Sequence, residues 1–117
     1  MIDIFTLPLF EKRLKYYNKK NPLLKKDFAK LLDLLEINPE PTTAIPLKEN
    51  VYKIRMANAS ANKGKSVGYR VYYFYKNRQG TLLLFYMHSK SDESNINDVR
   101  LDRLIRECEI FLKEIEK

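Results

Sequence analysis

The sequence predicts an α+β fold, with a helical hairpin and a C-terminal helix packed on a small, mostly antiparallel sheet of about four strands. Three patterns indicate this fold. Two neighbouring segments in the first third carry apolar residues at helical spacing, the middle of the chain has strand character, and the last segment returns to helical spacing. The expected element order is therefore β-α-α-β-β-β-α. The 117 residues, 44% of them hydrophobic, are expected to form a single domain, residues 1–117.

The N-terminal part is predicted to contain a short strand followed by two helices. Residues 2–5 alternate as in a strand, and Pro8 suits the first turn of a helix, where its missing N–H has no partner. A turn at residues 18–22 separates the helices, and Pro39 and Pro41 end the second. The apolar stripes are Phe10, Leu14 and Tyr17 in the first helix, and Leu24, Phe28, Leu31, Leu32 and Leu35 in the second.

Three predicted strands form the middle of the chain. Residues 51–56 alternate with period two, so Lys53 and Arg55 share one face. Residues 68–75 are dense in aromatic and β-branched side chains, and the apolar run 81–87 indicates a central strand. Residues 58–66 are predicted to be an exposed basic loop. The final helix carries the stripe Leu101, Leu104, Ile105, Cys108, Leu112 and Ile115.

The charge balance gives the first indication of function. Lysine and arginine number 22 against 15 acidic residues, which gives a net charge of +7 and a pI near 9.5. A basic domain attracts polyanions: nucleic acid, an anionic membrane surface or an acidic protein. The chain has no apolar run long enough for a membrane helix and no visible signal peptide, and a cytoplasmic location is expected. The single cysteine, Cys108, excludes an internal disulfide and indicates a buried structural thiol.

Several classes of chemistry are disfavoured by the residues present. One histidine, one cysteine and scattered carboxylates do not suggest a metal site, and no cofactor is expected. The segment 62–66 contains Gly-Lys-Ser but lacks the earlier glycine of a phosphate-binding loop. A triad drawn from Ser89 or Ser91, His88 and Asp92 is disfavoured, because neighbours in sequence rarely reach one another with triad geometry.

The remaining candidates for a functional site are basic residues on and near the predicted strands. Consecutive strands usually pair, so cations on them are expected to converge at one region of the sheet. Arginine and lysine bind phosphates, and aromatic rings stack on unpaired bases, which favours an RNA-binding surface. A solvated sheet face without a ligand is the alternative. The residues in question are Lys53, Arg55, Lys63, Lys65, Arg70, Tyr86, His88 and Lys90.

Three segments taken together resemble a known family. They are residues 50–56 around Tyr-Lys-Ile-Arg, residues 68–71 with Gly-Tyr-Arg-Val, and residues 86–92 with Tyr-Met-His-Ser-Lys-Ser-Asp. In this order and separation, following a helical hairpin, they resemble the RelE/HigB-like toxins of type II toxin–antitoxin systems. The resemblance implies a small basic endoribonuclease that needs no metal, cleaves mRNA in the ribosome and is silenced by a cognate antitoxin protein.

The resemblance also implies site residues. Lys53 and Arg55 match the family's basic pair, Arg70 matches the arginine of its Gly-Tyr-Arg, and Lys90 matches the basic position after its last strand. Members of the family often carry an arginine next and a tyrosine further on, whereas this chain has Ser91 and, near the tyrosine's place, Asn97. Lys90 or His88 is then the candidate acid for the leaving group.

The expected chemistry uses the RNA 2′-hydroxyl as nucleophile, so the protein need not supply one. Arg70 suits the stabilisation of charge on phosphoryl oxygens, because its planar fork fits phosphate and stays protonated. Lys53 is expected to act either as the base or as a phosphate clamp. Two alternative functions are a toxin of the same fold that poisons a protein target such as DNA gyrase, and a basic RNA-binding module without activity.

Overall fold

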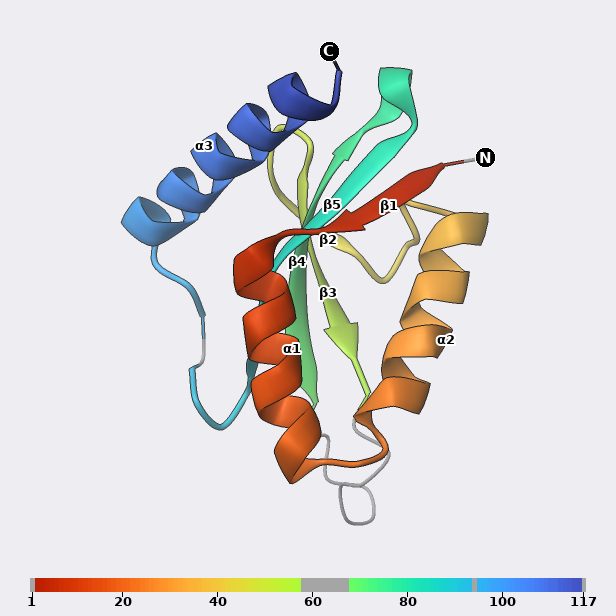
Figure 1. Cartoon of the computed structure of the whole chain (residues 1–117), viewed down its shortest axis with the longest axis vertical. Helices are drawn as coiled ribbons and strands as arrows, with labels where there is room; N and C mark the ends of the chain where they lie inside the picture. The colour runs from red at the N-terminus through yellow and green to blue at the C-terminus, as the bar shows by residue number, and fades with distance from the viewer. Residues whose placement is uncertain (1, 58–67, 94, 117) are drawn as a thin grey trace.

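The computed structural model describes residues 2–57, 68–93 and 95–116 (Figure 1). The helices and strands correspond closely to the predicted segments, with one strand added. They are β1 (Asp3–Thr6), α1 (Pro8–Lys20), α2 (Leu24–Ile37), β2 (Ile45–Lys48), β3 (Val51–Met56), β4 (Tyr69–Lys76), β5 (Thr81–Ser89) and α3 (Asp98–Ile115).

The described strands form one mixed sheet in the order β1-β5-β4-β3-β2. β2, β3, β4 and β5 pair in antiparallel fashion, as the sequence predicted for most of the sheet, and β5 is a central strand. Two details differ from the prediction. β1 pairs with β5 in parallel, and the expected four strands are five, because the short segment Ile45–Lys48 adds an edge strand. Pro46 within β2 is tolerated there, since an edge strand can leave one N–H side unpaired.

Helices cover both faces of the sheet, which gives the molecule two apolar clusters. α1 and α2 lie over one face, where Phe10, Leu24 and Leu35 pack against side chains that include Ile54 and Val71. α3 lies over the other face, and its stripe of Leu101, Leu104, Cys108 and Leu112 packs against Val51, Phe74 and Phe85 among others. In Figure 1, α3 lies beside the upper part of the sheet. The C-terminal end of β3 and the start of β4 lie below it. Among the described residues, no helix is long and apolar enough to cross a membrane.

Local sequence explains the ends of these elements. Pro8 occupies the first turn of α1, as predicted, and Lys19 and Lys20 lie in its last turn, where cations interact favourably with the helix dipole. Asn97 caps α3 by accepting a hydrogen bond from the backbone of Arg100 at 2.8 Å. The 3₁₀ turn Asn77–Gln79 ends at Gly80, whose φ of 62° lies in the left-handed region that favours glycine.

Side chains of α1 contact the part of the β5 edge that β1 does not reach. β1 pairs with β5 only as far as Leu84, and α1 then runs beside the remaining edge of β5. There the Arg13 side chain donates to the carbonyl of Met87, and the Tyr17 hydroxyl accepts from the backbone N–H of Ser89 at 3.0 Å. These side chains satisfy edge groups that a neighbouring strand would otherwise pair, and they fix α1 against the end of β5.

Candidate nucleic-acid interface

Sheet register brings six of the polar and aromatic side chains of interest to one face, in two rows across β3, β4 and β5. Residues directly opposite one another in a sheet point to the same side. Arg55 pairs with Arg70 and Arg70 with His88, which forms the outer row. Lys53 pairs with Tyr72 and Tyr72 with Tyr86, which forms the inner row. We call the Lys53, Arg55 and Arg70 part of this surface the cationic face.

The outer row places two arginines side by side. Arg55 is exposed and Arg70 is partly buried, and they are directly opposed on β3 and β4. Within the described residues, the buried Nη1 atom of Arg70 has no hydrogen-bond partner. An unpaired buried donor on a guanidinium is costly, and like charges at directly opposed positions repel. An anion lying between these side chains would relieve both costs.

Gly68 makes room for the arginine pair. A Cβ atom on this residue would lie 2.7 Å from the carbonyl oxygen of Met56 and 3.1 Å from Nε of Arg55. The first of these separations is shorter than carbon and oxygen tolerate, so the start of β4 can approach β3 this closely only with glycine there. The glycine of the Gly-Tyr-Arg segment therefore serves the placement of Arg55.

Lys53 completes the cationic face, and Lys90 follows directly after β5. Lys53 is partly buried in the inner row, and its Nζ donates to Oδ1 of Asn95 at 3.1 Å. Lys90 is exposed one residue beyond β5, and its backbone N–H still donates to the carbonyl of Gly68 at 3.2 Å. Lys63 and Lys65, the predicted RNA-binding lysines of the basic loop, lie outside the described residues.

His88 is placed differently from a catalytic acid. Its side chain is fully buried, Nδ1 lies 3.0 Å from the backbone carbonyl of Ser89, and Nε2 lies 2.9 Å from the Tyr72 hydroxyl. Because a carbonyl only accepts, Nδ1 carries the proton and Nε2 accepts from Tyr72. Burial lowers the pKa of His88 and raises the pKa of Tyr72, so the pair is neutral near pH 7. This geometry offers neither ring nitrogen to a ligand and does not support His88 as the leaving-group acid.

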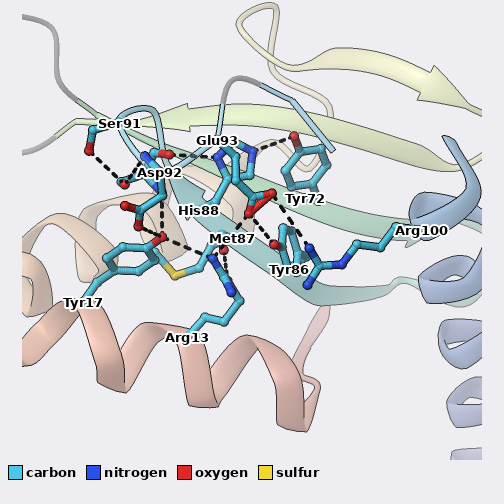
Figure 2. Close-up of polar contacts among 11 residues, drawn as sticks. Arg13, Tyr17, Tyr72, Tyr86, Met87, His88, Ser91, Asp92, Glu93 and Arg100 are labelled. Carbon is cyan, nitrogen blue, oxygen red and sulfur yellow. Dashed lines mark hydrogen bonds and ion pairs between the residues drawn. The ribbon is translucent and has the colours of Figure 1, made fainter. Parts of the chain in front are cut away.

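Tyr86 is also buried, so the geometry does not support its predicted role as a surface on which bases stack. The guanidinium carbons of Arg13 and Arg100 lie 4.6 and 4.7 Å from the centre of its ring, and Figure 2 draws the ring between the two arginines. Its hydroxyl donates to Glu93 at 2.7 Å. Burial, together with this hydrogen bond, raises the pKa of Tyr86 to about 12. Its ring has cationic partners within the protein already.

The disfavoured triad is not assembled. Ser89 and Ser91 hydroxyls lie 3.2 Å from each other, and the Asp92 carboxylate accepts from Tyr17 at 2.7 Å (Figure 2). His88 is hydrogen-bonded to Tyr72 and a backbone carbonyl instead of these side chains.

Cys108 is buried, as predicted, and burial raises the pKa of its thiol, which makes it a poor nucleophile. In the described part of the chain, no three histidine, cysteine or acidic side chains lie close enough to hold a metal ion.

Several side chains around the site were not anticipated from the sequence. Arg13, Glu93 and Asn95 contact residues of the two rows, and Tyr72 is itself a member of the inner row. Arg13 lies among other charged residues of an amphipathic helix, and nothing in its spacing distinguishes it. Asn97, which stands near the place of the family's tyrosine, has a defined structural role as the cap of α3. A polar residue just before a helical stripe is the one signal that could have identified this cap.

Within the described residues, the arrangement places cations next to one another on β3 and β4. Arg55 and Arg70 present two guanidinium groups at neighbouring positions, and Lys53 lies in the next row. Such a face suits the binding of phosphate oxygens and the stabilisation of charge that develops on them.

No family model matches the chain, and no curated protein matches it.

Proposed function

We propose that the protein is the toxin of a type II toxin–antitoxin pair, a metal-independent endoribonuclease that cleaves mRNA on the ribosome. The observation that carries the proposal is the alignment of Lys53, Arg55 and Arg70 on one sheet face by the register of β3 and β4, with an Arg70 Nη1 atom that has no partner among the described residues. The resemblance of these same segments to RelE/HigB-like toxins supplies the substrate and the biological role. The net charge of +7 agrees with an RNA substrate.

The proposed reaction uses the RNA's own 2′-hydroxyl. Its oxygen attacks the adjacent phosphorus as the bond to the 5′-oxygen of the next nucleotide breaks, which leaves a 2′,3′-cyclic phosphate and a 5′-hydroxyl. Arg70 and Arg55 bind the non-bridging oxygens, where negative charge builds in the transition state. Lys53 serves as the base that takes the 2′ proton, or as a third clamp on the phosphate while a solvent water takes that proton. Lys90, exposed at the end of β5, donates the proton to the leaving oxygen.

The proposal also names partners and a location. A cognate antitoxin would cover the cationic face with acidic and apolar side chains, in the cytoplasm where the mRNA and ribosomes are. Ile45 on β2, which pairs with Lys53 in the sheet register, is an exposed apolar residue available to such a partner. An antitoxin that docks mainly by charge should bind less tightly as ionic strength rises.

Two other functions are distinguished by the same experiment. A toxin that poisons DNA gyrase would not need a converging cationic site, and a plain RNA-binding module would not cleave. The test incubates the purified protein with end-labelled mRNA, naked and on bacterial ribosomes, and in parallel with gyrase and plasmid DNA. We expect cleavage on ribosomes with cyclic phosphate ends and full gyrase activity. Inhibited supercoiling with intact RNA would favour gyrase, and salt-sensitive binding of uncut RNA would favour the module.

A further inference from the structure

We propose that Tyr17 is a positioning residue for Lys90, the residue that protonates the leaving oxygen in the proposed reaction. The inference rests on the proposed function, because it concerns how Lys90 is presented to the RNA. Lys90 follows directly after β5 and lies in the turn formed by residues 89–92. Tyr17 on α1 contacts this turn on both sides of Lys90.

The Tyr17 hydroxyl connects two points of the turn. It accepts from the backbone N–H of Ser89, the residue before Lys90, at 3.0 Å. It donates to Oδ2 of Asp92, two residues after Lys90, at 2.7 Å. It also accepts from Nη2 of Arg13 at 3.2 Å, and Figure 2 draws it between Arg13 and Asp92. The hydroxyl thus donates once and accepts twice, which fixes its orientation.

The side chain of Tyr17 belongs to the core beneath the helical hairpin. It is only 4% exposed, and its ring packs edge-to-face on Tyr69 of β4 with ring centroids 5.1 Å apart. Burial raises the pKa of Tyr17, and the hydrogen bond from Tyr17 lowers the pKa of Asp92. At pH 7 a neutral hydroxyl therefore donates to a charged carboxylate, and such charge-assisted hydrogen bonds are stronger than neutral ones.

Contacts of the turn itself carry this anchoring to Lys90. The backbone N–H of Asp92 donates to Oγ of Ser89 at 3.2 Å and to the carbonyl of Ser89 at 3.3 Å. The backbone N–H of Lys90 donates to the carbonyl of Gly68 at 3.2 Å. Arg70 follows Gly68 by two residues, so these contacts hold Lys90 at the end of the sheet where Arg70 lies.

The proposed role of Lys90 makes its placement important for the rate. Its ammonium gives a proton to the 5′-oxygen as the bond between that oxygen and phosphorus breaks, and the electron pair of that bond stays on the oxygen. A reacting group displaced by about 1 Å can lower a rate by roughly a hundredfold. Loss of the Tyr17 hydroxyl should slow cleavage without weakening RNA binding, because the buried side chain offers no surface to RNA.

The test uses Tyr17→Phe with Tyr16→Phe as its control. Phenylalanine keeps the buried ring and removes only the hydroxyl, and Tyr16 is a half-exposed neighbour whose hydroxyl contacts Lys20 of the same helix. On mRNA-programmed ribosomes, Tyr17→Phe should lower kcat roughly tenfold to a hundredfold with KM within about twofold of wild type, whereas Tyr16→Phe should behave as wild type. A kcat of folded Tyr17→Phe within about threefold of wild type would overturn the inference.

A modified substrate distinguishes the positioning of Lys90 from a general effect on the fold. When sulfur replaces the 5′-oxygen at the cleaved position, the leaving group departs as a thiolate and needs no proton, because a thiol is a much stronger acid than an alcohol. On this substrate Tyr17→Phe and Lys90→Ala should each cleave within about threefold of the wild-type rate. On the oxygen substrate, Tyr17→Phe should cause no further loss in a Lys90→Ala background. A Tyr17→Phe loss that persists with sulfur would contradict the positioning role.

A second variant covers the case in which Tyr17→Phe does not fold. Asp92 is an exposed residue, and Asp92→Ala removes one of the two contacts between the turn and the Tyr17 hydroxyl. It should lower kcat on the oxygen substrate and recover on the sulfur substrate. A wild-type rate on the oxygen substrate would count against the inference.

A readout without activity separates this inference from the proposed function. The backbone amide signal of Lys90 in NMR spectra should shift in Tyr17→Phe and Asp92→Ala, and stay in place in Tyr16→Phe. An unmoved Lys90 signal in the first two variants would overturn the positioning role. If the wild-type protein cleaves no RNA, the proposed function fails and the Lys90 signal alone decides whether Tyr17 fixes this turn.

Discussion

Arg55 and Arg70 face each other directly across β3 and β4, so the sheet holds two permanently charged side chains at opposed positions. Like charges in this arrangement destabilise a sheet, by up to about 1 kcal/mol. Among the described residues, the buried Nη1 of Arg70 also lacks a hydrogen-bond partner, which adds to this cost. An anion bound between the two guanidinium groups would offset both costs, as the proposed function requires.

The opposed arginines predict that small anions stabilise the fold. Phosphate bound to the native state alone raises its stability by RT ln(1 + [L]/Kd), which is about 1.4 kcal/mol at ten times Kd. We expect the midpoint of thermal unfolding to rise with added phosphate for the wild type and to rise much less for Arg70→Ala. The comparison is made with potassium chloride at matched ionic strength, and an equal response of both proteins would argue against a phosphate site at Arg70.

Gly68→Ala should disturb Arg55 without removing any charge. The new methyl group would meet the Met56 carbonyl at 2.7 Å and Nε of Arg55 at 3.1 Å, so the start of β4 must move away from β3. Crowding of this kind costs about 1–3 kcal/mol. We expect a lower urea midpoint together with weaker binding of a single-stranded RNA. Gly80→Asn serves as the control, because asparagine tolerates the left-handed conformation of that turn, and it should leave RNA binding unchanged.

His88 predicts a pH dependence of stability. Its folded pKa lies below the ordinary value of 6.5, chiefly because of burial. As pH falls below about 6.5 the unfolded chain takes up a proton that the folded chain does not, so stability is full above this pH and is lost as pH falls toward the folded pKa. The slope approaches about 1.4 kcal/mol per pH unit for one proton.

The matching variant is His88→Gln, which should lose this slope between pH 7 and the folded pKa. Denaturant midpoints measured across that range for both proteins give the difference directly. The histidine is buried and neutral, so the pH–rate profile of cleavage should contain no step that disappears in His88→Gln. Such a step would return His88 to the role of an acid in the reaction.

Much of the fold follows from local pattern. The alternation of residues 51–56 correctly separated Lys53 and Arg55 from Tyr52, Ile54 and Met56, and the stripe of the last helix correctly predicted a buried Cys108. β2 was missed because four residues that include Pro46 give too short and too weak a strand signal. The parallel pairing of β1 with β5 joins segments far apart in sequence, which no local pattern specifies.

The candidate site was predictable only in part, because some of its contacts join segments far apart in the sequence. Cations on neighbouring strands could be expected to converge, because antiparallel strands that follow one another usually pair. The burial of His88 and Tyr86 could not, since it depends on packing contacts such as Tyr72 on His88 and Arg13 on the Tyr86 ring. Arg13 and Glu93 lie 80 positions apart in the sequence (93 − 13 = 80), and only the packing of α1 against β5 brings them together.

Single-turnover cleavage of ribosome-bound mRNA by folded Arg70→Ala tests the central claim most directly. Arg78→Ala is the matched control, because Arg78 is an exposed arginine in the turn after the opposite end of β4. Removal of one preorganised donor to the phosphoryl oxygens typically costs about 10²–10³ in rate. We expect this loss for Arg70→Ala, with thermal stability equal to or above that of the wild type because a repulsive pair is removed, and a wild-type rate for Arg78→Ala. An Arg70→Ala rate within about threefold of wild type would contradict the assignment of Arg70 to the transition state.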